Sequence, residues 1–232
     1  MLKTVLNAGL NPSYSVKYYR DGFYKLIRFN GGLAPRLPDD SDLTENREEQ
    51  SSSGKLSQAL SRARSVVFQL ALCNDWDYFF TGTIDRTKFN RYDLSVFYAA
   101  FSQWIRDQRK KYSCRIQYVL IPEMHKDGAW HLHGFVRGIP CSMISDFVPG
   151  IHPQALIDSG FKNWPAYSDK FGFCSLAPIQ DAVGCAHYVT KYITKDMASS
   201  VSDFGAHTYY CSIGLNRAVP LGFIFQRDAV LD

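Results

Sequence analysis

Several features are scarce or missing in the 232-residue sequence. No apolar run reaches the roughly 20 residues that a bilayer-spanning helix needs, and the apolar stretch within residues 1–10 is too short for a signal peptide. The six cysteines are scattered and include no CxxC pair, which argues against a zinc or redox site of that type. The net charge of +4 is too small to indicate a class of partner. We therefore expect a soluble, cytoplasmic protein whose cysteines are reduced core residues.

The composition excludes a largely disordered chain. Hydrophobic residues make up 46% of the sequence and aromatic residues 15%, which is enough apolar surface to offset the entropy lost on folding. The length suits one domain with a sizeable core and is slightly short for two. We expect one domain with extensions.

The N-terminal part differs in composition from the rest. Residues 14–28 interleave aromatic rings with lysines and arginines, a pattern that suits stacking on bases and neutralising phosphates, or an amphipathic strand or hairpin lying on the domain. Residues 31–54 are rich in Gly, Pro, Ser and acids, which is typical of an exposed linker. We predict an N-terminal extension with a linker over 1–54 and a compact domain over 55–232.

Hydrophobic periodicity predicts alternating helices and strands in the compact domain. Apolar residues at three- and four-residue spacings indicate helices over 55–72, 93–108 and 181–197. Runs of β-branched and aromatic residues indicate strands over 77–84, 115–123, 130–136 and 171–179. This order predicts an α+β domain in which helices pack on one face of a mainly antiparallel sheet.

Two histidines of the predicted strand 130–136 share one face. Side chains alternate along a strand, so His131 and His133 point the same way and can reach one ion. An HxH pair also arises often by chance, and core packing explains it equally well. The other histidines lack comparable support, and we interpret them as ordinary polar residues: His125, His152, His187 and His207.

Glu123 supplies a third candidate ligand. If residues 126–128 form a three-residue hairpin loop with Gly128 in the left-handed conformation, Glu123 lies directly opposite His131. A two-residue loop would place Glu123 on the other face. One carboxylate and two imidazoles suit a divalent ion that acts as a Lewis acid, with Mn²⁺ or Mg²⁺ favoured and Zn²⁺ also compatible.

The last predicted helix carries two tyrosines and two lysines on one face. Tyr188, Lys191, Tyr192 and Lys195 are spaced at i, i+3, i+4 and i+7. A tyrosine hydroxyl has a pKa near 10 and attacks poorly without a nearby cation or a polarised phosphate, and Lys191 lies one turn from both rings. The alternative is a solvated face with partly buried rings.

Three segments, taken in order, resemble the motifs of HUH endonucleases, particularly the rolling-circle replication initiators (Rep proteins) of plasmids, phages and small single-stranded DNA viruses. Residues 79–83 (FFTGT) are similar to the first strand motif. Residues 123–133 (EMHKDGAWHLH) resemble the metal motif, and residues 188–192 (YVTKY) resemble the YxxK motif in its two-tyrosine form. The resemblance covers a motif core of roughly 77–195.

The resemblance implies a ferredoxin-like fold with the HUH strands central in the sheet. It also implies that a metal at the Glu123, His131 and His133 site polarises the scissile phosphate of single-stranded DNA. Tyr188 would then form a 5′-phosphotyrosyl intermediate, with Lys191 as its partner, and Tyr192 would make a second attack. On the same resemblance, DNA contacts are assigned to Thr81, Thr83 and Lys195. Residues 192–195 also spell YxxK, so the order of the tyrosines is open, with Tyr188 preferred.

The partners implied are single-stranded DNA at a replication origin and a host helicase and polymerase, because the sequence contains no GxxxxGK[ST] motif for unwinding. Other interpretations remain open. A relaxase or transposase of a mobile element would share the chemistry. A non-catalytic DNA-binding module, or a metal-dependent hydrolase with structural tyrosines, would not.

Overall fold

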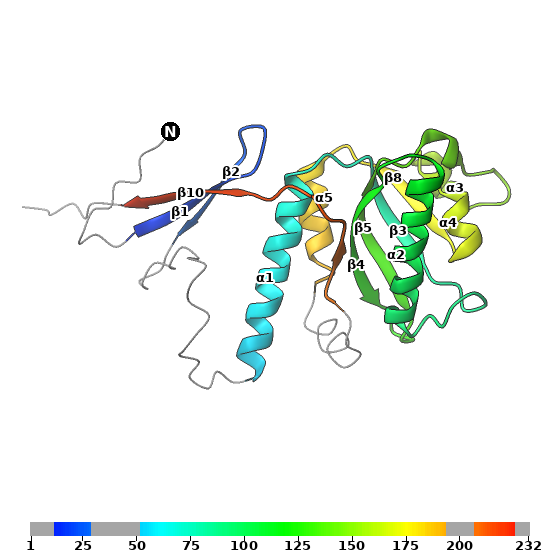
Figure 1. Ribbon diagram of the computed structural model, residues 1–232, viewed down its shortest axis with the longest axis horizontal. Coiled ribbons are helices and arrows are strands. Elements are labelled where there is room, and N and C mark those ends of the chain that lie inside the picture. Colours follow the sequence, from blue (N-terminus) through cyan, green and yellow to red (C-terminus); the bar gives the residue numbers. More distant parts are fainter. Residues whose placement is uncertain (1–11, 29–51, 194–206, 226–232) are drawn as a thin grey trace, which may run out of the picture.

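The computed structural model describes residues 12–28, 52–193 and 207–225, and in these ranges the strands form a seven-stranded and a three-stranded sheet (Figure 1). The strands of the large sheet are β3 (Tyr78–Thr83), β4 (Gln117–Met124), β5 (Trp130–Arg137), β6 (Ser145–Asp146), β7 (Lys162–Asn163), β8 (Cys174–Pro178) and β9 (Tyr210–Cys211). They lie in the order β6-β7-β8-β3-β5-β4-β9, and each pairing is antiparallel.

Helices cover both faces of this sheet (Figure 1). They are α1 (Ser52–Leu72), α2 (Leu94–Lys111), α3 (Gln154–Asp158), α4 (Pro165–Lys170) and α5 (Ala182–Thr190), with a 3₁₀ turn at Cys141–Met143. The chain order β3-α2-β4-β5-α4-β8 with the spatial order β8-β3-β5-β4 is that of the ferredoxin-like fold. The predicted α+β class is confirmed.

The prediction that helices pack on one face only is wrong. α2 and α4 lie on one face, whereas α1 and α5 lie on the other (Figure 1). The reason is that the central strands are apolar on both faces: the first six residues of β4 are buried without alternation. Such a strand has to be covered from both sides.

The face under α2 and α4 is filled with aromatic rings. Asp93 caps α2 by accepting hydrogen bonds from two backbone amides of its first turn, and the buried side chains of α2 are the predicted ones, Leu94, Phe97, Phe101, Trp104 and Ile105. Phe101 packs edge-on against Tyr118 of β4, with ring centroids 5.3 Å apart. Trp104 lies 5.0 Å from Trp164. This ring layer forms much of the core.

The helix expected over 55–72 is confirmed as α1, which begins at Ser52 and packs against α5. The strand expected over 171–179 is shorter, because Phe171 ends α4 and β8 begins at Cys174. All six cysteines are free, but only Cys73 and Cys174 are buried, and Cys141 is exposed. The expectation that all are core residues is therefore wrong.

The small sheet joins two distant parts of the chain. Its strands are β1 (Pro12–Tyr18), β2 (Tyr24–Arg28) and β10 (Val219–Phe225), in the antiparallel order β10-β1-β2. The hairpin among the N-terminal alternatives is thus confirmed. Most of the expected linker over 31–54 lies outside the described residues. Among the helices in the described ranges, none is both long and apolar enough to cross a membrane.

Candidate active site

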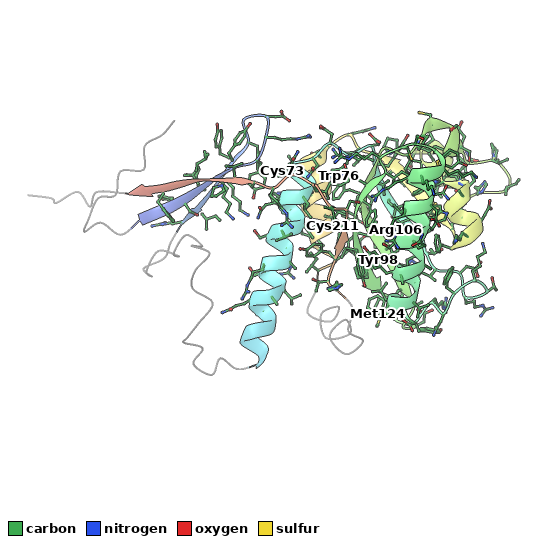
Figure 2. The ribbon with its side chains drawn as sticks, in the orientation of Figure 1. Cys73, Trp76, Tyr98, Arg106, Met124 and Cys211 are labelled. Atoms are coloured by element: carbon green, nitrogen blue, oxygen red, sulfur yellow. The ribbon has the colours of Figure 1, made fainter. Side chains whose placement is uncertain are left out.

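The β4–β5 hairpin has the predicted register. His125 donates its backbone N–H to the carbonyl of Ala129 at 2.9 Å, and Gly128 has a φ of +81°. The loop therefore contains three residues, and Glu123 is paired directly with His131. Because the side-chain period along a strand is two, Glu123, His131 and His133 share one face of the sheet. Figure 2 labels Met124, which follows Glu123 at the end of β4 where this hairpin turns.

Strand β3 lies on the other side of β5 and adds two threonines to the same face. Thr81 is paired with His133, and Thr83 with His131. The Thr81 hydroxyl lies 3.4 Å from His133 Nδ1, whereas the Thr83 hydroxyl donates to the carbonyl of Phe173 at 2.9 Å. The structure thus brings both threonines beside the histidine pair.

Glu123 is at the centre of an imidazole cluster. Its Oε2 atom lies 2.8 Å from His133 Nε2 and 3.7 Å from His125 Nε2. The ring of His125 stacks on that of His131, with centroids 3.6 Å apart and an interplanar angle of 6°. The interpretation of His125 as an ordinary polar residue overlooked this contact. The alternation of positions 123 and 125 on β4 is the sequence signal that places it on this face.

Burial keeps the two predicted histidine ligands uncharged. It lowers the pKa of His133 more than the nearby Glu123 carboxylate raises it. For His131 burial is again the largest cause of a lowered pKa, and the charges of His125 and His133 add to it. A neutral imidazole has a free nitrogen lone pair, which is the form that binds a metal ion.

The donor chemistry of this cluster suits a divalent ion. One carboxylate and neutral imidazoles are available on an open face, the set that we associated with a Lewis-acid metal. Within the described ranges, however, no three ligand-type side chains already surround a common point, because Glu123 is hydrogen-bonded directly to His133. An ion held here would replace that hydrogen bond.

The helix that carries the tyrosines is shorter than predicted. Asp181 caps α5 by accepting from the Gly184 amide at 2.9 Å, but the α-helix ends at Thr190 rather than continuing to residue 197. The next three residues form tighter turns, whose amides bond to carbonyls three residues earlier. Thr190 is β-branched, and its hydroxyl donates to the His187 carbonyl at 2.9 Å, which weakens a continuing helix. Lys195 lies outside the described residues.

Both tyrosines nevertheless lie over the histidine face. The ring of Tyr192 stacks on that of His133, with centroids 4.1 Å apart and an interplanar angle of 6°. The Tyr192 hydroxyl donates to the Tyr188 hydroxyl at 2.6 Å. Tyr188 packs against Phe79 of β3, at 5.6 Å between centroids, and is 47% exposed. The two phenol oxygens are thus adjacent to each other and next to the histidine cluster.

The two tyrosines have different electrostatic surroundings. Burial, followed by the hydrogen bond to Tyr188, raises the pKa of Tyr192. Tyr188 is instead the ring nearest a cation, because Lys191 Nζ lies 5.8 Å from its centroid. Tyr188 therefore has the cation and the exposure, and Tyr192 has the contact with His133.

Helix α1 holds the turn after α5 in place. Arg64 donates from Nε to the carbonyl of Ile193 at 2.8 Å, and Val189 and Ile193 are fully buried. These apolar residues pack inward, as the helical pattern predicted. Sequence reasoning missed Arg64, which had been interpreted only as part of an amphipathic helix 129 residues earlier in the chain.

A comparison with protein families agrees with this arrangement. A family model whose description begins "Replication-associated protein ORF2" matches residues 77–197, slightly more than half of the 232 residues. The matched segment begins just before β3, includes the β4–β5 hairpin and passes the end of α5. No curated protein and no solved structure matches the chain.

Proposed function

The chain belongs to this family of replication-associated proteins, and we propose that it is an HUH endonuclease that nicks and rejoins single-stranded DNA to initiate rolling-circle replication. One observation carries the proposal: Tyr192 stacks on His133 and is hydrogen-bonded to Tyr188, so two phenol oxygens lie beside the Glu123–His133 pair. A purely structural tyrosine pair does not require this polar neighbourhood.

In the proposed reaction the Tyr188 oxygen attacks the phosphorus of the scissile phosphodiester. A bond forms between that oxygen and phosphorus, and the bond from phosphorus to the 3′ oxygen breaks. The phenol loses its proton and the leaving 3′ oxygen gains one, so one phosphodiester is exchanged for another. The 5′ end stays on the protein as a phosphotyrosine, and rejoining therefore needs no ATP.

The surroundings of Tyr188 favour its phenolate. The hydrogen bond donated by Tyr192 falls on the atom where negative charge develops, and the ammonium group of Lys191 is nearby. Tyr188 is also more accessible to a DNA strand than Tyr192, whose raised pKa makes it the weaker nucleophile in this arrangement. We therefore propose that Tyr188 attacks first and that Tyr192 makes the second attack that ends a round.

Glu123, His131 and His133 would hold Mn²⁺ or Mg²⁺, which would polarise the scissile phosphate. The hydroxyl groups of Thr81 and Thr83 lie on the same face and are proposed DNA contacts, together with Lys195. The free 3′-OH would be extended by a host polymerase, and the duplex would be opened by a host helicase. Single-stranded DNA at the origin is the proposed substrate.

A covalent adduct tests this function. The full chain is incubated with Mn²⁺ and a labelled single strand from the origin, and the products are separated on a denaturing gel. Wild type is expected to form an adduct that Tyr188→Phe/Tyr192→Phe does not form. Tyr112→Phe is the matched control, because Tyr112 is exposed at the end of α2. Equal nicking without adduct in the wild type and the double variant would overturn the proposal.

The same assay addresses the rival functions. A non-catalytic DNA-binding module would retain the strand but neither cut it nor form an adduct. A metal-dependent hydrolase would cut without an adduct. A relaxase or transposase would form the adduct on a transfer or transposon end rather than on a replication origin, so substrate choice separates these enzymes.

A further inference from the structure

The small sheet has an outer face that points away from α1. Side chains alternate along β1 and β2, so one face carries the residues Tyr14, Val16, Tyr18, Tyr24, Leu26 and Arg28. On the opposite, inner face, Lys25 Nζ lies 5.1 Å from the ring centroid of Phe68 in α1. Tyr19 also packs there, 5.9 Å from Phe68. The inner face is therefore the one attached to the domain.

The outer face presents aromatic and aliphatic side chains to solvent. Tyr24 is 53% exposed and Leu26 is 56% exposed. The rings of Tyr18 and Tyr24 lie side by side on neighbouring strands, with centroids 5.1 Å apart and an interplanar angle of 48°. Contiguous exposed apolar surface of this kind usually marks a binding site. A pair of tyrosines on an open sheet is the arrangement on which proteins stack unpaired bases.

The charge of the sheet favours a polyanion over a second copy of the chain. The sequences of the three strands include Lys17, Lys25 and Arg28 and no acidic residue. A second copy would bring the same positive charge to the face and be repelled, and a lysine in an edge strand such as β2 opposes edge-to-edge pairing. A nucleic acid satisfies both the cations and the rings, and a single strand leaves its bases free to stack.

The sheet is attached to the helices that carry the tyrosines. Arg20 forms an ion pair with Asp75 just after α1, in the region where Figure 2 labels Cys73 and Trp76. Phe68 of α1 lies 4.9 Å from the ring of His187, the residue before Tyr188. The small sheet and the tyrosines are therefore on the same side of the large sheet.

We propose that the outer face is a second DNA-binding site, which holds single-stranded DNA by stacking bases on Tyr18 and Tyr24. Phosphates would pair with Arg28 on that face and with Lys25, which is exposed on the edge strand β2. This inference rests on the proposed handling of single-stranded DNA, but not on the tyrosine chemistry. It gives the enzyme a second hold on the strand outside the cutting site.

Binding of a labelled oligothymidine, measured by fluorescence anisotropy, tests the second site. The full-length Tyr188→Phe/Tyr192→Phe variant is used in EDTA, so that nicking is absent. In this background Tyr18→Ala/Tyr24→Ala is expected to raise the Kd for a strand of about 20 thymidines at least tenfold, since each stacked base is lost. Lys25→Ala/Arg28→Ala is expected to reduce the slope of log Kd against log salt by about 1.4.

Two controls separate stacking from folding and site from surface. Tyr18→Phe/Tyr24→Phe keeps both rings and is expected to bind within about twofold of the parent, whereas Tyr112→Ala removes an exposed ring elsewhere and is expected to leave the Kd unchanged. An unchanged Kd in Tyr18→Ala/Tyr24→Ala would overturn the inference. So would a loss of dimer in light scattering without a change in DNA binding, which would identify a second copy as the occupant.

The failure of this inference is distinguishable from failure of the proposed function. With the catalytic tyrosines intact, Tyr18→Ala/Tyr24→Ala is expected to form adduct normally on a short strand that reaches only the cutting site. If no protein forms an adduct but binding of the long strand still depends on the two rings, the second site stands and the nuclease does not. If adduct forms and the rings have no effect on binding, the nuclease stands and the second site does not.

Discussion

The two faces of the large sheet are built from different side chains. Under α2 and α4 the strands contribute rings and aliphatic groups, such as Phe80 and Tyr118, which are almost completely buried. Under α5 the same strands contribute Thr81, His133 and Glu123 near the hairpin. A single residue of register separates these two sets. The comparison indicates that one face supplies stability, and this allows the other to hold polar groups that do not stabilise the fold.

The largest expected effect on stability lies on the ring face. Phe97 is fully buried and packs on Phe171, with centroids 5.3 Å apart. Phe97→Ala is expected to lower the free energy of unfolding by about 3–5 kcal/mol, because it leaves a cavity in the ring layer. Val96→Ala on the exposed side of the same helix is the control, with an expected change below about 0.5 kcal/mol. Urea titration measures both, and similar losses would contradict the assignment of stability to this face.

On the polar face the largest effect should be on activity. Glu123→Gln removes the only carboxylate of the cluster described above and is expected to reduce nicking about a thousandfold, a loss of several kcal/mol in transition-state stabilisation. Mn²⁺ binding, followed by electron paramagnetic resonance, should weaken in parallel. Asp107→Asn on α2 should alter neither property. Full nicking by Glu123→Gln, or nicking that persists in EDTA, would show that the cluster is not a metal site.

A smaller effect is expected at the hairpin that sets the register of Glu123. Gly128 has a φ of +81°, and an added Cβ would meet Tyr92 at an ordinary distance of 3.6 Å. The cost of Gly128→Ala is therefore conformational, about 1–2 kcal/mol in thermal or urea unfolding. Gly128→Asn should cost less, because asparagine adopts this conformation more readily. Equal stability of the alanine variant and wild type would contradict the left-handed turn.

The smallest effect is a pH dependence of stability. The pKa values of His131 and His133 are lowered in the folded state by burial. Their contribution to stability is therefore full above the ordinary histidine pKa of about 6.5 and decreases as the pH falls from there through the lowered values, since the unfolded chain binds protons that the folded chain excludes. His133→Gln should flatten this decrease in urea titrations at several pH values. The exposed His207→Gln should not, and a similar flattening by both would contradict burial as the cause.

Local patterns predicted the elements that place the candidate site. The alternation of β4 and β5, with an odd loop ending in Gly128, was sufficient to pair Glu123 with His131. The buried face of α2 followed from helical spacing. In both cases neighbours in the sequence determine the geometry, so a single sequence contains the information.

Contacts between distant segments were not predictable in this way. The pairing of β1 with β10 joins residues about 200 positions apart, and nothing local selects that partner. The hydrogen bond from Arg64 to the Ile193 carbonyl depends on how α1 crosses α5. The early end of α5 was missed because the spacing of Tyr188 and Tyr192 fits a continuing helix equally well, although a Thr190 side-chain hydrogen bond accompanies its end.

The most direct test of the nuclease mechanism is to locate the phosphotyrosine. Wild-type protein is reacted with Mn²⁺ and an origin strand, the adduct is digested with protease and nuclease, and the modified peptide is identified by mass spectrometry. The nucleotide is predicted on Tyr188, with Tyr192 modified only after a second attack or when Tyr188 is replaced by phenylalanine. Nicked DNA with no modified tyrosine, or a nucleotide on a residue remote from His133, would contradict the proposed mechanism.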